Sequence, residues 1–154
     1  MPESDPAFTA PATLVVLDTN VVLDLWLFGD ARSAPLRQAL AAGRLTPLAT
    51  APMLAELADV LQRPFTAGWP VPPAQALVAL QTCARLVDPP APAAPPAPRC
   101  TDPDDQKFID LAWHWPAAWL ISRDRAVLRL ARPALARGLR IVTPDRWAVL
   151  NPAG

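Results

Sequence analysis

Short apolar runs alternate along this chain with apolar residues at helical spacing. The clearest run, Leu14–Leu17, contains two β-branched residues and ends at Asp18. A run this short that stops at a turn-forming cluster is typical of a buried strand in a parallel sheet. Weaker runs predict further strands at 45–49, 119–122 and 139–143.

Between these runs the apolar side chains recur three and four residues apart, which is the spacing of an amphipathic helix. Such segments predict helices over 21–28, 33–42, 51–62, 72–87, 102–112 and 123–131, and a helical turn at 144–147. Strands that alternate with helices indicate a three-layer α/β/α sandwich with a mainly parallel central sheet.

The length of 154 residues predicts one domain. We place it over residues 12–150, after a loose, flexible tail at 1–11 that carries acids and lacks the basic start of a signal peptide. Residues 89–98 are almost purely Pro and Ala. We interpret them as a stiff surface connector within the domain, with a linker between two domains as the alternative.

Composition excludes disordered and membrane proteins. Apolar residues make up 52% of the chain and charged residues 18%, which is typical of a globular protein. No apolar stretch approaches the length of a transmembrane helix, so we expect no membrane contact. Cys83 and Cys100 lack the spacing of a zinc site, and we expect them to be free thiols in a cytoplasmic protein.

The formal net charge is zero, so no overall field attracts nucleic acid. The charge is nevertheless unevenly distributed, because residues 99–146 contain nine basic and six acidic side chains. A basic surface that contacts RNA is one interpretation of this surplus, and ordinary solvated helix surface is the other.

Acidic residues at the ends of predicted elements are the main candidates for chemistry. Asp18 and Asp124 each follow a strand, Asp105 lies at a helix start, and Glu56 lies on a helix. Open α/β sheets bind their ligands at the carboxyl ends of parallel strands. Four carboxylates in one cleft repel each other unless a cation lies among them. Oxygen ligands without His or Cys favour Mg²⁺ or Mn²⁺ over zinc.

Each of these acids also has an ordinary structural interpretation. Asp18 is a possible helix cap, although the two residues after it offer capping groups of their own. Glu56 alone would be helix surface, and Asp105 would complement a helix dipole. We interpret Asp102 as the cap of the helix that begins at Pro103.

Four segments resemble the motifs of the PIN-domain family, the metal-dependent ribonucleases that include many toxins of bacterial toxin–antitoxin pairs. These segments are Leu14–Asn20, Thr50–Leu57 with its continuation to Arg63, Asp102–Ala112 and Trp119–Asp124. The resemblance covers about residues 13–147, which is nearly the whole chain. The third segment, together with Asp18-Thr19-Asn20, is specific to a subgroup of this family whose members are often labelled as toxin components.

The resemblance implies which residues form the site. The catalytic and metal-binding acids would be Asp18, Glu56, Asp105 and Asp124, with Thr19, Asn20 and Ser122 as polar supports. Arg123 stands where the subgroup often has Gly, and this bulky cation would either reshape the cleft or reach a substrate phosphate. The implied activity is Mg²⁺- or Mn²⁺-dependent endonuclease hydrolysis of RNA. The implied partners are the RNA substrate, a cognate antitoxin and a second copy of the chain in a homodimer.

Two alternatives remain open at this point. A PIN fold that binds RNA or protein without turnover would retain the same acids. A haloacid-dehalogenase-type phosphatase also has an early strand-end Asp, but it usually has a second Asp two residues later, where this chain has Asn20. The only lysine, Lys107, is poorly placed for the lysine of such an enzyme.

Overall fold

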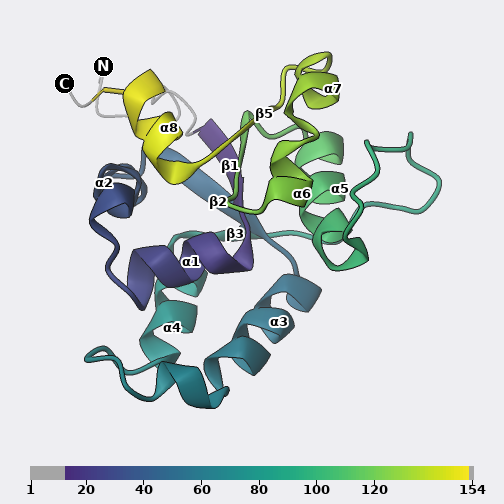
Figure 1. Ribbon diagram of the computed structural model, residues 1–154. Coiled ribbons are helices and arrows are strands. Elements are labelled where there is room, and N and C mark those ends of the chain that lie inside the picture. The colour runs from purple at the N-terminus through teal and green to yellow at the C-terminus, as the bar shows by residue number, and fades with distance from the viewer. Residues whose placement is uncertain (1–12, 153–154) are drawn as a thin grey trace, which may run out of the picture.

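A five-stranded parallel sheet forms the centre of the molecule in the computed structural model, which describes residues 13–152 (Figure 1). The strands are β1 (Thr13–Leu17), β2 (Leu45–Ala49), β3 (Arg85–Leu86), β4 (Trp119–Ile121) and β5 (Arg140–Val142). Their order across the sheet is β3-β2-β1-β4-β5, and each neighbouring pair is parallel. The parallel sheet predicted from the apolar runs is confirmed.

Helices connect the strands throughout the described part of the chain. The α-helices are α1 (Thr19–Trp26), α2 (Ala34–Ala41), α3 (Ala51–Leu61), α4 (Ala74–Cys83), α5 (Gln106–His114), α6 (Arg125–Leu128), α7 (Ala131–Leu135) and α8 (Pro144–Leu150). Short 3₁₀ turns are η2 (Ala31–Ser33), η3 (Pro64–Thr66) and η4 (Pro103–Asp105). None of the helices between residues 13 and 152 combines the length and apolarity that crossing a bilayer requires.

The helices cover both faces of the sheet. Successive side chains of a strand point to opposite faces, so an apolar strand such as β1 packs against helices on each side. Val15 and Leu17 of β1 pack in a core cluster with side chains of α1, α2, α4 and α8. Val16, which lies between them, packs in a second cluster with α5, α6 and α7. The result is a three-layer α/β/α sandwich, as the alternation of strands and helices predicts (Figure 1).

The helix starts follow from local sequence. Thr50 caps α3 by accepting the backbone N–H of Met53 at 3.4 Å, and Pro52 lies in the first turn, where its missing N–H costs nothing. Gly43 follows α2 with φ +76°, a backbone conformation that glycine adopts without steric cost. Both termini agree with the boundaries predicted for these two helices.

Several boundaries differ from the prediction. The helix predicted to 87 ends at Cys83, and the chain then forms β3, whose two residues are exposed at the sheet edge. The helix predicted over 123–131 is divided into α6, which Asp124 caps, and α7, which continues to Leu135. The turn predicted at 144–147 continues as α8 to Leu150.

The Pro/Ala-rich segment 89–98 forms neither helix nor strand, and its Ala97 is buried in the cluster with α5. The tail predicted over 1–11 lies outside the described residues.

The order of the strands creates a switch point next to β1. The chain leaves β1 toward β2 and β3 on one side, and it later returns to β4 and β5 on the other side. Connections that depart in opposite directions leave a crevice at the carboxyl ends of the two central strands. Asp18 follows β1 directly and Ser122 follows β4 directly, so both residues lie at this crevice.

Candidate metal centre

Asp18 is buried at the carboxyl end of β1, with 3% of its surface exposed. Its Oδ1 accepts the backbone N–H of Val21 at 2.9 Å, so Asp18 itself is the cap of α1. The expectation that Thr19 or Asn20 supplies the cap is therefore wrong. Thr19 lies inside the first turn, and its hydroxyl is directed to another helix.

Ser122 connects the two central strand ends. Its hydroxyl donates to Oδ2 of Asp18 and accepts the backbone N–H of Asp124 at 3.0 Å. Asp124 in turn caps α6, because its Oδ1 accepts the N–H of Ala126 at 2.8 Å. Asp18 and Asp124 are thus each followed by the helix that they cap, and Ser122 contacts both.

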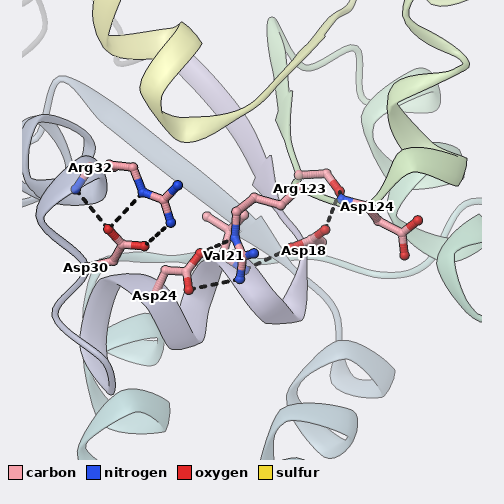
Figure 2. A network of polar contacts seen from close by, with 8 residues as sticks. Asp18, Val21, Asp24, Asp30, Arg32, Arg123 and Asp124 are labelled. Carbon is pink, nitrogen blue, oxygen red and sulfur yellow. Dashed lines mark hydrogen bonds and ion pairs between the residues drawn. The ribbon is translucent and has the colours of Figure 1, made fainter.

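Arg123 contacts α1 and does not line the acidic cleft. Its guanidinium donates to both oxygens of Asp24, with Nε–Oδ2 at 2.5 Å and Nη2–Oδ1 at 3.0 Å. Figure 2 shows the Arg123 side chain extended toward Asp24, whereas the carboxylate of Asp124 points to the other side. The structure therefore places Arg123 in an ion pair with Asp24 of α1 and outside the lining of the acidic cleft.

Three aspartates form the tightest acidic group of the described residues. Asp102, Asp105 and Asp124 each contribute one carboxylate oxygen, and these oxygens lie within 4.8 Å of one another. Oδ2 of Asp105 is buried and has no hydrogen-bond partner within residues 13–152. Across the same part of the chain, no Lys or Arg forms an ion pair with any of the three.

Asp102 was interpreted from the sequence only as a helix cap. It does cap η4, since its Oδ1 accepts the N–H of Asp104 at 3.0 Å. The structure shows in addition that Asp102 stands next to Asp105 and Asp124. The signal in the sequence was the density of acids in the segment 102–105, which a single capping role does not require.

Burial raises the pKa of Asp18 to about 6, and the charge of Asp124 adds to the increase against the hydrogen bonds from Ser122 and Val21. Burial also raises the pKa of Asp105 to about 7, with the adjacent Asp124 carboxylate as the next cause. Both increases mean that negative charge at these positions is poorly compensated by the protein itself. A bound cation would supply the missing compensation.

Glu56 lies on α3 and is held by two donors. The Thr19 hydroxyl donates to Oε2 at 2.6 Å, and the Lys107 ammonium group contacts Oε1 at 2.9 Å. Glu56 therefore lines the same cleft as the aspartates but is not part of their close group.

One open cleft of about 320 Å³ contains all four acids predicted from the resemblance. Its lining comes from α1, α3, η3, η4 and α5 and from the residues that precede α1, η3, η4 and α6. It consists of Asp18, Thr19, Asn20, Leu23, Glu56, Val60, Arg63, Phe65, Asp102, Asp104, Asp105, Phe108 and Asp124. A larger cavity of about 490 Å³ lies at the amino end of β2, and its lining contains no carboxylate. The chemistry therefore belongs to the smaller cleft.

The donor set fits a hard divalent cation. All candidate ligands are carboxylate oxygens, one of which is buried without a partner, and the group is partly open to solvent. Mg²⁺ and Mn²⁺ favour such oxygen ligands and retain waters, whereas structural zinc sites use Cys and His. Asp105 and Asp124, with Asp102 and Asp18 beside them, are the residues that would hold the ion.

The chain was also compared with known proteins. The family model described as PIN domain matches residues 14–126, which include all four acids of the cleft. No curated protein matches the chain. The PIN domain is a nuclease-type fold, and the cluster of Asp102, Asp105 and Asp124 fits metal binding.

Proposed function

The chain belongs to the PIN-domain family, and on that basis we propose that it is a metal-dependent endoribonuclease that hydrolyses RNA phosphodiester bonds with Mg²⁺ or Mn²⁺. The observation that carries this proposal is the buried oxygen of Asp105, which has no partner in the described residues and lies within an aspartate cluster. Most buried polar atoms in folded proteins have a hydrogen-bond partner, and a bound cation would account for this exception.

We assign Asp105 and Asp124 as the principal ligands of the cation and Asp18 as a further acid of the site. When bound, the cation supplies Lewis-acid polarisation of the scissile phosphate and charge neutralisation. Ser122 keeps Asp18 and Asp124 in a fixed relation, because its hydroxyl contacts both residues. Fixed ligands reduce the reorganisation that substrate binding would otherwise require.

The lining of the cleft supports a nucleic-acid substrate. Arg63 and Phe65 of the α3–η3 segment line it together with the acids. Half of the surface of Phe65 is exposed, so its ring is accessible to a base, and Arg63 is a cation within the lining. Exposed aromatic and basic side chains together bind single-stranded nucleic acid by stacking and charge attraction. RNA is proposed because the first and third motifs resemble the toxin subgroup.

We also propose that the protein is the toxin of a toxin–antitoxin pair, that it acts in the cytoplasm, and that it forms a homodimer. These assignments rest on the resemblance of the motifs. A neighbouring gene for a small DNA-binding protein would support the toxin role. Co-expression of the two proteins should then produce a stable complex without RNA cleavage, and a neighbour that neither binds nor inhibits would contradict the role.

The proposed activity is tested by incubating purified protein with a panel of RNAs in Mg²⁺, Mn²⁺ or EDTA. We expect cleavage with either metal and none with EDTA. A small phosphate ester in parallel reactions distinguishes a phosphatase, which would hydrolyse it. Absence of RNA cleavage despite demonstrated metal binding would overturn the nuclease assignment and favour a binding module.

A further inference from the structure

Glu56 has an internal cation as its partner. The ammonium group of Lys107 lies 2.9 Å from Oε1, and the Thr19 hydroxyl donates to Oε2 at 2.6 Å. Both oxygens of the carboxylate therefore already have protein donors. The Lys107 and Glu56 side chains are each about one-third exposed, at 30% and 32% of their surfaces, so the pair lies within reach of ions from solvent.

Lys107 is held in place by more than its contact with Glu56. Its ammonium group also donates to the backbone oxygen of Asp104 and lies 4.8 Å from the centre of the Phe108 ring. Lys107 belongs to the first turn of α5, two residues after Asp105. The same short segment therefore carries a metal-binding acid and a positive charge that faces the opposite wall of the cleft.

The carboxylates on the two sides of the cleft therefore differ in whether a protein cation neutralises them. Asp102, Asp105 and Asp124 have no ion-pair partner in residues 13–152, whereas Glu56 is neutralised by Lys107. An ion placed at Glu56 would have to displace the lysine or tolerate its repulsion. An ion placed at the aspartates meets no such obstacle.

We propose that the ammonium group of Lys107 takes the place of a metal ion beside Glu56. The cleft then binds one divalent ion, at the aspartates, and not two. This proposal rests on the proposed metal-dependent function and specifies its metal count. Lys107 is thus a positioning residue: it fixes Glu56 and keeps a second ion out.

The test is the number of Mn²⁺ ions bound per chain, measured without RNA by calorimetry and by the loss of free Mn²⁺ signal in electron paramagnetic resonance. We expect one ion for the wild type and two for Lys107→Met at concentrations that saturate the first site. Arg32→Met is the matched control, because it also removes a cation paired with an acid, Asp30, but outside the cleft. It should bind one ion.

The double variant Lys107→Met/Glu56→Gln should return to one ion, because the carboxylate freed by the first change is removed by the second. If Lys107→Met does not fold, Lys107→Gln replaces it, because it also removes the positive charge but remains polar, and it should bind two ions. The wild-type ion count decides independently of either variant.

Two ions bound to the wild type, or one ion bound to a folded variant without the Lys107 charge, would each overturn the assignment of Lys107. These results would leave the nuclease proposal intact. Absence of any Mn²⁺ binding by the wild type would instead overturn the metal-dependent function itself, so the two failures are distinguishable.

Discussion

Arg123 donates to both carboxylate oxygens of Asp24 and so attaches the loop after β4 to α1 (Figure 2). The two residues are 99 positions apart in sequence. The Asp24 side chain is almost fully buried, with 4% of its surface exposed, while that of Arg123 is 43% exposed. A buried carboxylate requires such a partner, because an unpaired charge in the protein interior is strongly unfavourable. This ion pair holds Ser122 and Asp124, which flank Arg123, next to Asp18.

Removing Arg123 should therefore destabilise the fold. In Arg123→Met the buried Asp24 loses its partner, and we expect a loss of about 2 kcal/mol in the free energy of unfolding, less than for a fully buried pair because Arg123 is partly exposed. Urea denaturation measures this loss. Arg125→Met is the control, because Arg125 is exposed and forms no ion pair in the described residues. Equal stability of the two variants would contradict the structural role of the pair.

Stability should depend on pH in the direction set by the raised pKa values. Asp18 and Asp105 have pKa values of about 6 and about 7 in the folded protein, whereas an unfolded Asp has a pKa of about 3.9. Between these limits the folded state binds more protons than the unfolded state. Without metal, the free energy of unfolding should therefore fall as pH rises from about 4 to about 7, by on the order of 2 kcal/mol from Asp18 alone.

Denaturation in EDTA at several pH values measures this dependence. Asp18→Asn should reduce the slope, because the amide resembles the protonated acid and carries no charge. Saturating Mn²⁺ should reverse the trend, since the ion binds the ionised carboxylates of the folded state. A metal-free protein whose stability rises with pH over this range would refute the account.

Ser122 offers a separate test of how the strand ends are held. In Ser122→Ala, Asp18 loses a buried hydrogen-bond donor and the N–H of Asp124 loses its acceptor. We expect a loss of about 1–3 kcal/mol in the free energy of unfolding and a further rise in the pKa of Asp18, because that hydrogen bond favours the ionised form. A buried serine outside the cleft, Ser33, provides the matched Ser→Ala control. Titration of Asp18 by NMR distinguishes a specific effect from general destabilisation, and an unchanged pKa would argue against this role.

Asp→Asn substitutions at Asp102 and at Asp104 should affect Mn²⁺ affinity differently. Asp102 belongs to the close aspartate group, whereas Asp104 lines the cleft outside it. Asp102→Asn should weaken Mn²⁺ binding about 10-fold, and Asp104→Asn should have a much smaller effect. Calorimetry compares the two dissociation constants. A larger loss in Asp104→Asn would move the ion away from the group proposed here.

The sequence predicted the sheet, most helices and the acids at the strand ends because these features depend on local patterns. Leu14–Leu17 specifies a buried strand, and Asp18 at its end needs no distant information to be noticed. Arg85 and Leu86 were missed because a two-residue, exposed edge strand has no apolar periodicity. Its pairing with β2 becomes evident only in the folded sheet.

The partners of the charged side chains were less predictable. The bonds from Arg123 to Asp24 and from Lys107 to Glu56 join residues 99 and 51 positions apart, and no local pattern encodes such distances. Local reasoning assigned Asp102 the capping role that it does fill, but only the path of η4 into α5 brings it to Asp124. Sequence therefore identified four of the acids in the cleft, and the fold added Asp102 and determined which charges remain uncompensated.

The central claim is that Asp105 holds the ion on which RNA cleavage depends, and the most direct measurement is the cleavage rate of a single labelled RNA in Mn²⁺. Wild type is compared with Asp105→Asn and with Asp88→Asn, which removes the same charge from an exposed position outside the cleft. We predict a loss of about 100-fold or more for Asp105→Asn and a wild-type rate for Asp88→Asn. The Asp105→Asn protein should remain folded in EDTA, because the change removes a poorly compensated charge. Equal cleavage by all three proteins would contradict the claim.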